Sequence, residues 1–259
     1  MVKSSGDGVV ALAGMNLVSA LVALALLPFV TPPTPAAALV IAISLLLHSV
    51  YKIALAQLYA RAELSLGYPL ARGLTPIFAT LLAFLFLTEV PSGATLAGVI
   101  AISLGIAGLV FERGARAASS ASLAAAVIVG LSVAAYTALD AYGVRLNQDW
   151  LGFTVWLVIA DSAVFLGYTF ATRRGAAWLQ WRRSWGRTLI SGVLGLASYG
   201  VFMWALGRAQ VGAVAALRET SIIFAALLGT ALLKERMTRG RIVSSLLVAI
   251  GAAAIALVR

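Results

Sequence analysis

Ionisable residues inside long apolar stretches are the first candidates for chemistry in this sequence. Arg72 and Arg218 each lie within such a stretch. A charged side chain at the centre of a bilayer costs roughly 2.5–3.5 kcal/mol on insertion scales, so each arginine needs a reason to be there. A guanidinium offers a permanent charge and a planar fork that fits a carboxylate. We therefore predict that both arginines line a cavity and bind the anionic group of a substrate.

The alternative for these arginines is structural. Arg218 would then pair with Glu219 or with an aspartate and tie helices together. Adjacent positions of a helix point about 100° apart, which argues against a pair between Arg218 and Glu219. Pro69 and Pro76 flank Arg72 and cannot donate a backbone hydrogen bond. Carbonyls freed in this way are tolerated in a membrane beside a cavity, which favours the substrate-binding interpretation.

Other polar side chains within apolar stretches complete the predicted substrate site. They are His48, Tyr51, Lys52, Tyr136, Asp140 and Tyr199. His48 and Lys52 are four positions apart and therefore share a helix face, and Tyr136 and Asp140 repeat that spacing. Asp140 could receive a cationic substrate group, relay a proton, or form a structural pair with Lys52. For His48 and Lys52, the alternative is hydrogen bonding between helices.

No enzyme signature is present. The sequence has no Gly-x-Ser-x-Gly, no His-Glu-x-x-His and no phosphate-binding glycine loop. One histidine and no cysteine exclude a multi-histidine or thiolate metal centre, so we expect no metal and no cofactor. The enzyme alternative is an intramembrane aspartyl protease in which Asp140 and Asp161 share a proton. The glycine-flanked aspartate motif of that class is absent, and a non-transporting scaffold or assembly subunit is a further alternative.

The composition requires these residues to be carried by membrane-spanning helices. Of the residues, 62% are apolar and 11% are charged, against about a quarter charged in soluble domains. The apolar residues form nine blocks, each near the ~20 residues that a spanning helix needs. We predict an all-α, polytopic membrane helix bundle with nine helices. Their ranges are 8–30, 35–60, 66–88, 94–111, 122–144, 150–172, 188–207, 211–233 and 240–258.

Basic residues indicate how the chain is oriented. In alternate loops, thirteen lysines and arginines lie on one side and three on the other, so the rich side should be cytoplasmic and Arg259 outside. The net charge of +10 is therefore a topology signal, and no nucleic-acid partner is expected. The stretch 173–187 holds five arginines and three tryptophans, which favours an interfacial turn of helix over a partner-binding site.

The two halves of the chain resemble each other. Residues 72–89, moved forward by 146, match at eight of eighteen positions, and these include the pairs Arg72–Arg218 and Glu89–Glu235. We predict two repeats, 1–117 and 118–259. The repeat unit has five helices, an odd number, so the copies must be inverted, as in many secondary transporters. The first copy has four helices, and its first helix would lie before Met1.

The sequence resembles the EamA-type branch of the drug/metabolite transporter superfamily. The motifs that carry the resemblance are Leu64–Gly73 with Pro76, and Leu217–Ser221 with Phe224, each followed by a helix-ending glutamate. The resemblance implies two inverted five-helix repeats, so this chain differs from the family by one helix. It also implies that both termini lie in the cytoplasm, whereas the charge distribution places the C-terminus outside.

The function implied by this resemblance is secondary transport without ATP. The substrates would be small metabolites, amino acids or related carboxylates, moved in the export direction. We expect an integral, multi-pass protein of the bacterial inner membrane whose partners are a small-molecule substrate and the lipid bilayer. A homo-oligomer is left open. Flux into sealed vesicles would separate a transporter from a protease or a scaffold.

Overall fold

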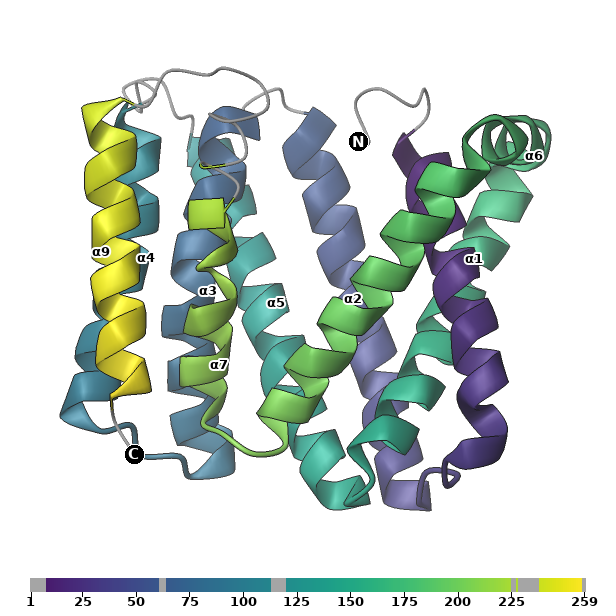
Figure 1. Ribbon diagram of the computed structural model, residues 1–259, viewed down its shortest axis with the longest axis horizontal. Coiled ribbons are helices and arrows are strands. Elements are labelled where there is room, and N and C mark those ends of the chain that lie inside the picture. Colours follow the sequence, from purple (N-terminus) through teal and green to yellow (C-terminus); the bar gives the residue numbers. More distant parts are fainter. Residues whose placement is uncertain (1–7, 61–63, 113–119, 225–226, 228–237, 258–259) are drawn as a thin grey trace. The chain divides into compact units, whose positions relative to one another are not determined.

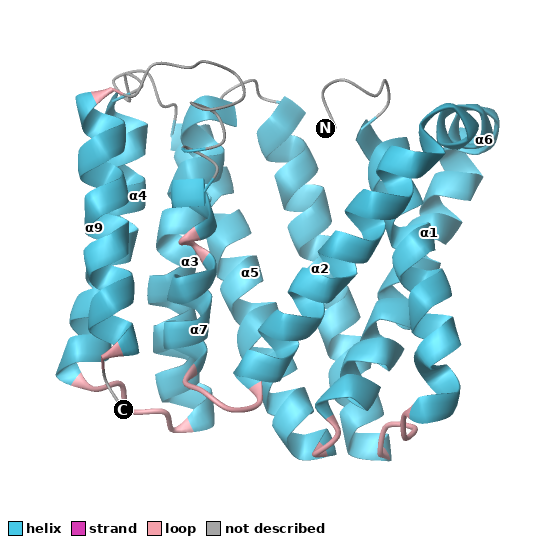
Figure 2. Cartoon of the chain, in the orientation of Figure 1, coloured by secondary structure: helices cyan, strands magenta, loops and turns pink. Residues whose placement is uncertain are grey.

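The fold consists of helices joined by short loops. The computed structural model describes residues 8–60, 64–112, 120–224, 227 and 238–257. Figure 2 shows only helices and loops in these residues, so the predicted all-α class is confirmed. The elements are α1 Gly8–Leu26, the 3-10 helix η2 Leu27–Phe29, α2 Pro35–Ala60, α3 Leu64–Leu87, α4 Gly93–Glu112, α5 Ser120–Asn147, α6 Trp150–Leu206, α7 Val211–Arg218 and α9 Arg239–Ala256.

The helices have the length and composition of membrane spans. Seven stretches of the described residues are long and apolar enough to cross a bilayer, and α4 contributes a shorter apolar helix, Gly93–Gly108. Large apolar side chains such as Leu46, Phe86 and Ile250 are exposed along these helices, where lipid would cover them. The prediction of a multi-pass membrane protein is therefore confirmed.

Three predicted segments differ in detail from the helices that form. Segments 150–172 and 188–207 belong to one long element, α6, which is broken where Arg173 and Ser184 leave the helical region of φ and ψ. Segment 211–233 is helical from Val211 to Arg218 and then interrupted by a turn, and its end lies outside the described residues. The other six segments coincide with helices to within a few residues.

The piece of α6 between the two breaks runs across the direction of its arms. Figure 1 shows this piece end-on while both arms are seen from the side. Trp178 is 65% exposed, whereas Trp181 is 5% exposed and its indole N–H donates to the carbonyl of Val10 at 2.8 Å. One tryptophan thus anchors the piece to α1 and another points outward, an arrangement suited to the predicted interfacial position.

The contacts group the helices into two compact units. Unit 1 contains residues 1–45 and 142–207, and unit 2 contains residues 46–141 and 208–259. The helices α2 and α5 each contribute to both units. This grouping mixes the two halves of the sequence and does not follow the boundary predicted between residues 117 and 118. The predicted repeats are defined by sequence likeness, which the grouping does not test, and they stay a prediction.

In unit 1, a polar residue fixes the start of α6. Asp149 accepts hydrogen bonds from the backbone N–H of Gly152 at 2.9 Å and from the hydroxyl of Thr31 at 2.8 Å. Burial acts to raise the pKa of Asp149, but the hydrogen bonds from Gly152, Thr31 and Leu151 outweigh it, so the pKa lies below its ordinary value of 3.8. Asp149 is therefore a charged N-cap that also holds the loop after α1.

In unit 2, α4 and α9 lie side by side and approach closely through glycines, as Figure 1 shows. A Cβ atom added to Gly98 would lie 2.6 Å from the carbonyl oxygen of Gly251, and one added to Gly105 would lie 2.8 Å from that of Ser244. In the 146-residue register, Gly98 corresponds to Ser244, and Gly105 corresponds to Gly251. The contact between Gly98 and Gly251 is therefore equivalent to the contact between Ser244 and Gly105. A two-fold axis between α4 and α9, as the predicted inverted repeat requires, would produce this pairing.

Candidate functional site

The candidate site lies in unit 2, where a membrane helix is interrupted. α7 ends at Arg218, and the next residues form a tight turn in which the N–H of Glu219 bonds to Ala216 O at 3.0 Å and that of Thr220 bonds to Leu217 O at 3.1 Å. Helix ends carry a partial negative charge on their carbonyl groups, which favours a cation such as Arg218 in the last turn. An interrupted helix of this kind often forms the substrate site of a secondary transporter.

The second arginine is carried by a helix that contains two prolines. Pro69 and Pro76 both lie inside α3, on either side of Arg72. Pro76 has no N–H, so it cannot donate the usual bond to the carbonyl of Arg72 four residues earlier. The neighbouring Thr75 hydroxyl bonds to the carbonyl of Ala71 at 2.9 Å. The regular helical hydrogen bond from residue 76 to the carbonyl of Arg72 is therefore missing in α3.

One buried carboxylate lies between the two arginines. Glu219 is 0% exposed, and its Oε2 accepts a hydrogen bond from Arg72 Nε at 2.6 Å. Its Oε1 lies 3.6 Å from Arg218 Nε, a distance that makes an ion pair but exceeds a hydrogen bond. The side chains of Arg72 and Arg218 are 27% and 30% exposed. Two fixed positive charges therefore converge on one negative charge.

The pair between Arg218 and Glu219 corrects the expectation that these neighbours would point apart. That expectation assumed a continuous helix, in which successive side chains are rotated by about 100°. The helix ends at Arg218, and Glu219 lies in the following turn, so the helical rotation does not apply. The structural alternative named for Arg218 is thus present in the structure, together with a cavity beside it.

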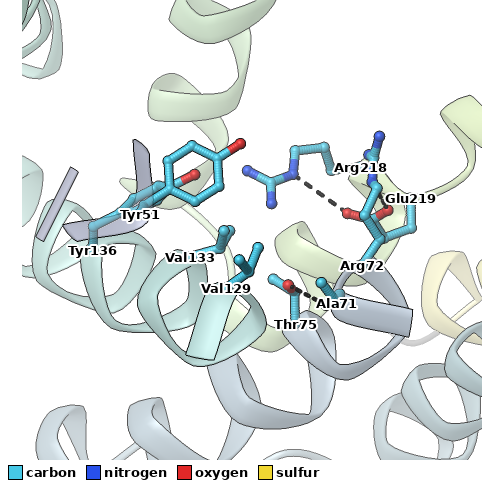
Figure 3. A pocket seen from close by; sticks show the side chains of 9 residues that line it. All are labelled: Tyr51, Ala71, Arg72, Thr75, Val129, Val133, Tyr136, Arg218 and Glu219. Atoms are coloured by element: carbon cyan, nitrogen blue, oxygen red, sulfur yellow. Dashed lines mark hydrogen bonds and ion pairs between the residues drawn. The ribbon is translucent and has the colours of Figure 1, made fainter. Parts of the chain in front are cut away.

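The cavity beside these charges has a volume of about 160 Å³. It is lined by Tyr51, Ala71, Arg72, Thr75, Val129, Val133, Tyr136, Arg218 and Glu219. Figure 3 shows the hydroxyls of both tyrosines directed toward the side of the cavity that holds the Arg218 guanidinium. Since a water molecule occupies about 30 Å³ of liquid, the space corresponds to roughly five waters or one small metabolite. It can hold a compact molecule that carries a carboxylate.

Comparison with models of protein families assigns the chain to a family. The model of the EamA-like transporter family matches residues 120–257, which is more than half of the sequence. The chain belongs to the EamA-like transporter family. This family is part of the drug/metabolite transporter superfamily, so the predicted resemblance is confirmed. No curated protein matches the chain in a sequence comparison.

Membership of the EamA family determines the broad class of activity. Its members are transporters of small molecules and not enzymes, which agrees with the helices described above. The chain is thus an integral, multi-pass membrane protein of the transporter type, with a small-molecule substrate and the bilayer as its partners.

A second pair of ionisable side chains in this EamA-family protein lies on α2 and α5. Asp140 is 0% exposed, and its Oδ2 lies 3.6 Å from His48 Nε2. The ring of His48 meets that of Tyr136 edge-on, with centroids 4.2 Å apart. Tyr136 also lines the cavity, so its ring connects the pair to the site. We predicted Lys52 as the structural partner of Asp140, and the contact of Asp140 with His48 was not predicted.

The predicted site residues thus fall into two groups. Arg72, Arg218, Tyr51 and Tyr136 line the cavity. The remaining four, His48, Lys52, Asp140 and Tyr199, are not among its lining residues. Lys52 is half-buried one turn from His48, and Tyr199 belongs to unit 1, where its ring lies 6.4 Å from that of Phe202. A role of any of these residues toward a substrate stays a prediction.

Glu219 is the site residue that the sequence analysis missed as a functional candidate. It appeared there only as a structural partner that Arg218 would avoid. The signal was present, because an acidic residue inside an apolar segment is as costly in a bilayer as a basic one. The same rule that selected Arg72 and Arg218 selects Glu219.

Proposed function

We propose that this EamA-family protein is a secondary transporter that exports small metabolites bearing a carboxylate, namely amino acids or related carboxylates, across the bacterial inner membrane. The observation that carries the proposal is the convergence of Arg72 and Arg218 on one small cavity between membrane helices. Among the described residues that line the cavity there are two guanidiniums and one carboxylate, so the lining has a net positive charge that suits a substrate anion. A planar guanidinium fork matches a carboxylate in two hydrogen bonds.

The energy source in this proposal is a gradient. The sequence carries no phosphate-binding glycine loop with which a transporter would bind ATP. The buried pair of His48 and Asp140 supplies titratable groups beside the cavity, which makes a proton a reasonable coupling ion to test first.

The test is flux through purified full-length protein in sealed proteoliposomes. Labelled alanine, serine and other small amino acids are followed with and without a pH gradient, in both directions of the substrate gradient. Wild-type protein should move at least one of them faster than empty vesicles do. Absence of flux for every small amino acid and carboxylate tested, from protein that is folded and oriented, would contradict the proposal.

Variants of the two arginines connect the flux to the site. Arg72→Ala and Arg218→Ala should each lower the flux by tenfold or more, and Arg72→Lys should lower it less, because lysine keeps the charge and loses the fork. Arg208→Ala is the matched control, since Arg208 is exposed in the loop between α6 and α7 and does not line the cavity. Normal transport by both alanine variants would show that the arginines are structural.

A further inference from the structure

One oxygen of the buried Glu219 carboxylate accepts a hydrogen bond, and the other accepts none from the described residues. Oε2 accepts the 2.6 Å bond from Arg72, whereas Oε1 is buried and accepts no hydrogen bond from any described residue. Arg218 Nε is 3.6 Å from Oε1, too far to donate to it. A buried oxygen left without a donor is costly, and such an atom calls for an explanation.

Glu219 lies beside the cavity, so a bound ligand is the partner that its unsatisfied oxygen could accept a hydrogen bond from. Glu219 lines the cavity together with both arginines, and Figure 3 shows its carboxylate between the Arg72 and Arg218 side chains. Among the described residues that line the cavity there is one acid for two guanidiniums, and the 146-residue shift carries Glu219 to Gly73, which has no side chain. A ligand that donates a hydrogen bond to Oε1 would satisfy this oxygen, and an anionic group on the same ligand would meet the Arg218 guanidinium.

We propose that Glu219 binds the ammonium group of the substrate, so that the site selects small zwitterionic amino acids over plain carboxylates. This inference rests on the proposed transport function and specifies its substrate class. The substrate carboxylate meets the Arg218 guanidinium, the ammonium group meets Glu219 Oε1, and Arg72 keeps Glu219 ionised and in place. The two charged groups of an α-amino acid lie on adjacent carbons, which suits acceptor and donor atoms 3.6 Å apart.

The size of the cavity limits the side chain of the amino acid. About 160 Å³ leaves little space once the backbone groups are placed, and Val129 and Val133 form the apolar wall that a side chain would meet. Alanine, with a single methyl group, is therefore the probe, and propionate is its matched analogue, which differs only in lacking the ammonium group.

The experiment compares binding of alanine and propionate by calorimetric titration of the purified full chain. Wild-type protein should bind alanine about 5- to 150-fold more tightly than propionate, since propionate leaves the buried oxygen of Glu219 unpaired. Glu219→Gln should reduce this ratio to about threefold or less, while its amide oxygen can still accept the bond from Arg72. Glu89→Gln is the matched control and should keep the wild-type ratio, because Glu89 caps the start of α7 at Val211 N and does not line this cavity.

Two results would overturn the proposal. Equal affinity of wild-type protein for alanine and propionate would remove any role for the ammonium group, and this measurement is decisive even if Glu219→Gln does not fold. An unchanged preference in a folded Glu219→Gln variant would assign the ammonium group to another residue. Binding of propionate without preference leaves the transport function standing, whereas binding and flux of neither compound would refute both proposals.

Discussion

Replacing Arg72 by alanine should destabilise the folded protein through the charge that it leaves behind. Glu219 is 0% exposed and would lose its 2.6 Å partner, keeping only Arg218 at 3.6 Å. Removing one partner of a buried pair costs about 3–5 kcal/mol. Because Arg72 is 27% exposed and one guanidinium remains, we expect the lower end, about 3 kcal/mol. At 2–4 °C per kcal/mol for a chain of this size, the Tm should fall by roughly 6–12 °C.

The assay is thermal unfolding of purified protein in detergent, followed by size-exclusion chromatography of heated samples. The control is the double variant Arg72→Met with Glu219→Leu, which removes the charges of Arg72 and Glu219 and leaves groups of similar volume, while Arg218, 30% exposed, keeps its charge. Such replacements of a buried pair are often neutral or stabilising, so the double variant should unfold within about 1 kcal/mol of wild type. It should also have lost carboxylate transport. A wild-type Tm for Arg72→Ala, or a double variant as unstable as the single one, would refute the reasoning.

Three further predictions concern other parts of the chain. Gly251→Ala should lower the free energy of unfolding by about 1–3 kcal/mol, because the added Cβ would lie 2.6 Å from the carbonyl oxygen of Gly98. Gly93→Ala is the control and should not lower it, because nothing lies within 4 Å of a Cβ at Gly93. Equal Tm values of the two variants would contradict this prediction. Asp149 has a lowered pKa in the folded protein, so its negative charge stabilises the folded state above pH 3.8, and this stabilisation is lost on acidification. The difference in Tm between wild type and Asp149→Asn should therefore shrink below pH 3.8. A difference that does not change with pH would count against this prediction. A reporter fused after Arg259 should be active outside the cytoplasm, and activity of a cytoplasm-only reporter there would reverse the predicted orientation.

Most of the helices could be predicted because bilayer thickness imposes a length on apolar runs. The segment 35–60 coincides with α2, and the segment 150–172 starts with α6 at residue 150 and ends where the non-helical Arg173 breaks α6. The turn after Arg218 could not be found in this way. The local sequence Leu217–Ser221 contains neither proline nor glycine, so nothing in it marks a helix end. That turn is the reason Glu219 and Arg218 can meet.

The candidate site was predicted in part. The 146-residue register singled out Arg72 and Arg218, and the structure brings both to the same carboxylate. Spacing placed His48 on one helix face and Asp140 on another, but a face does not specify which neighbour it meets. The contact between His48 and Asp140 depends on how α2 and α5 pack, which no pattern within one helix encodes.

The exchanged glycine contacts between α4 and α9 have the form of a homodimer interface. In a two-fold dimer, residue i of one copy meets residue j of the other, and j meets i in return. On the predicted repeat, Gly98 with Gly251 and Ser244 with Gly105 are one such reciprocal pair. A chain cut between residues 112 and 120 would carry the two surfaces on separate polypeptides that recognise each other. On the same predicted repeat, Gly98 and Ser244 are one equivalent position of the two copies, occupied by different residues.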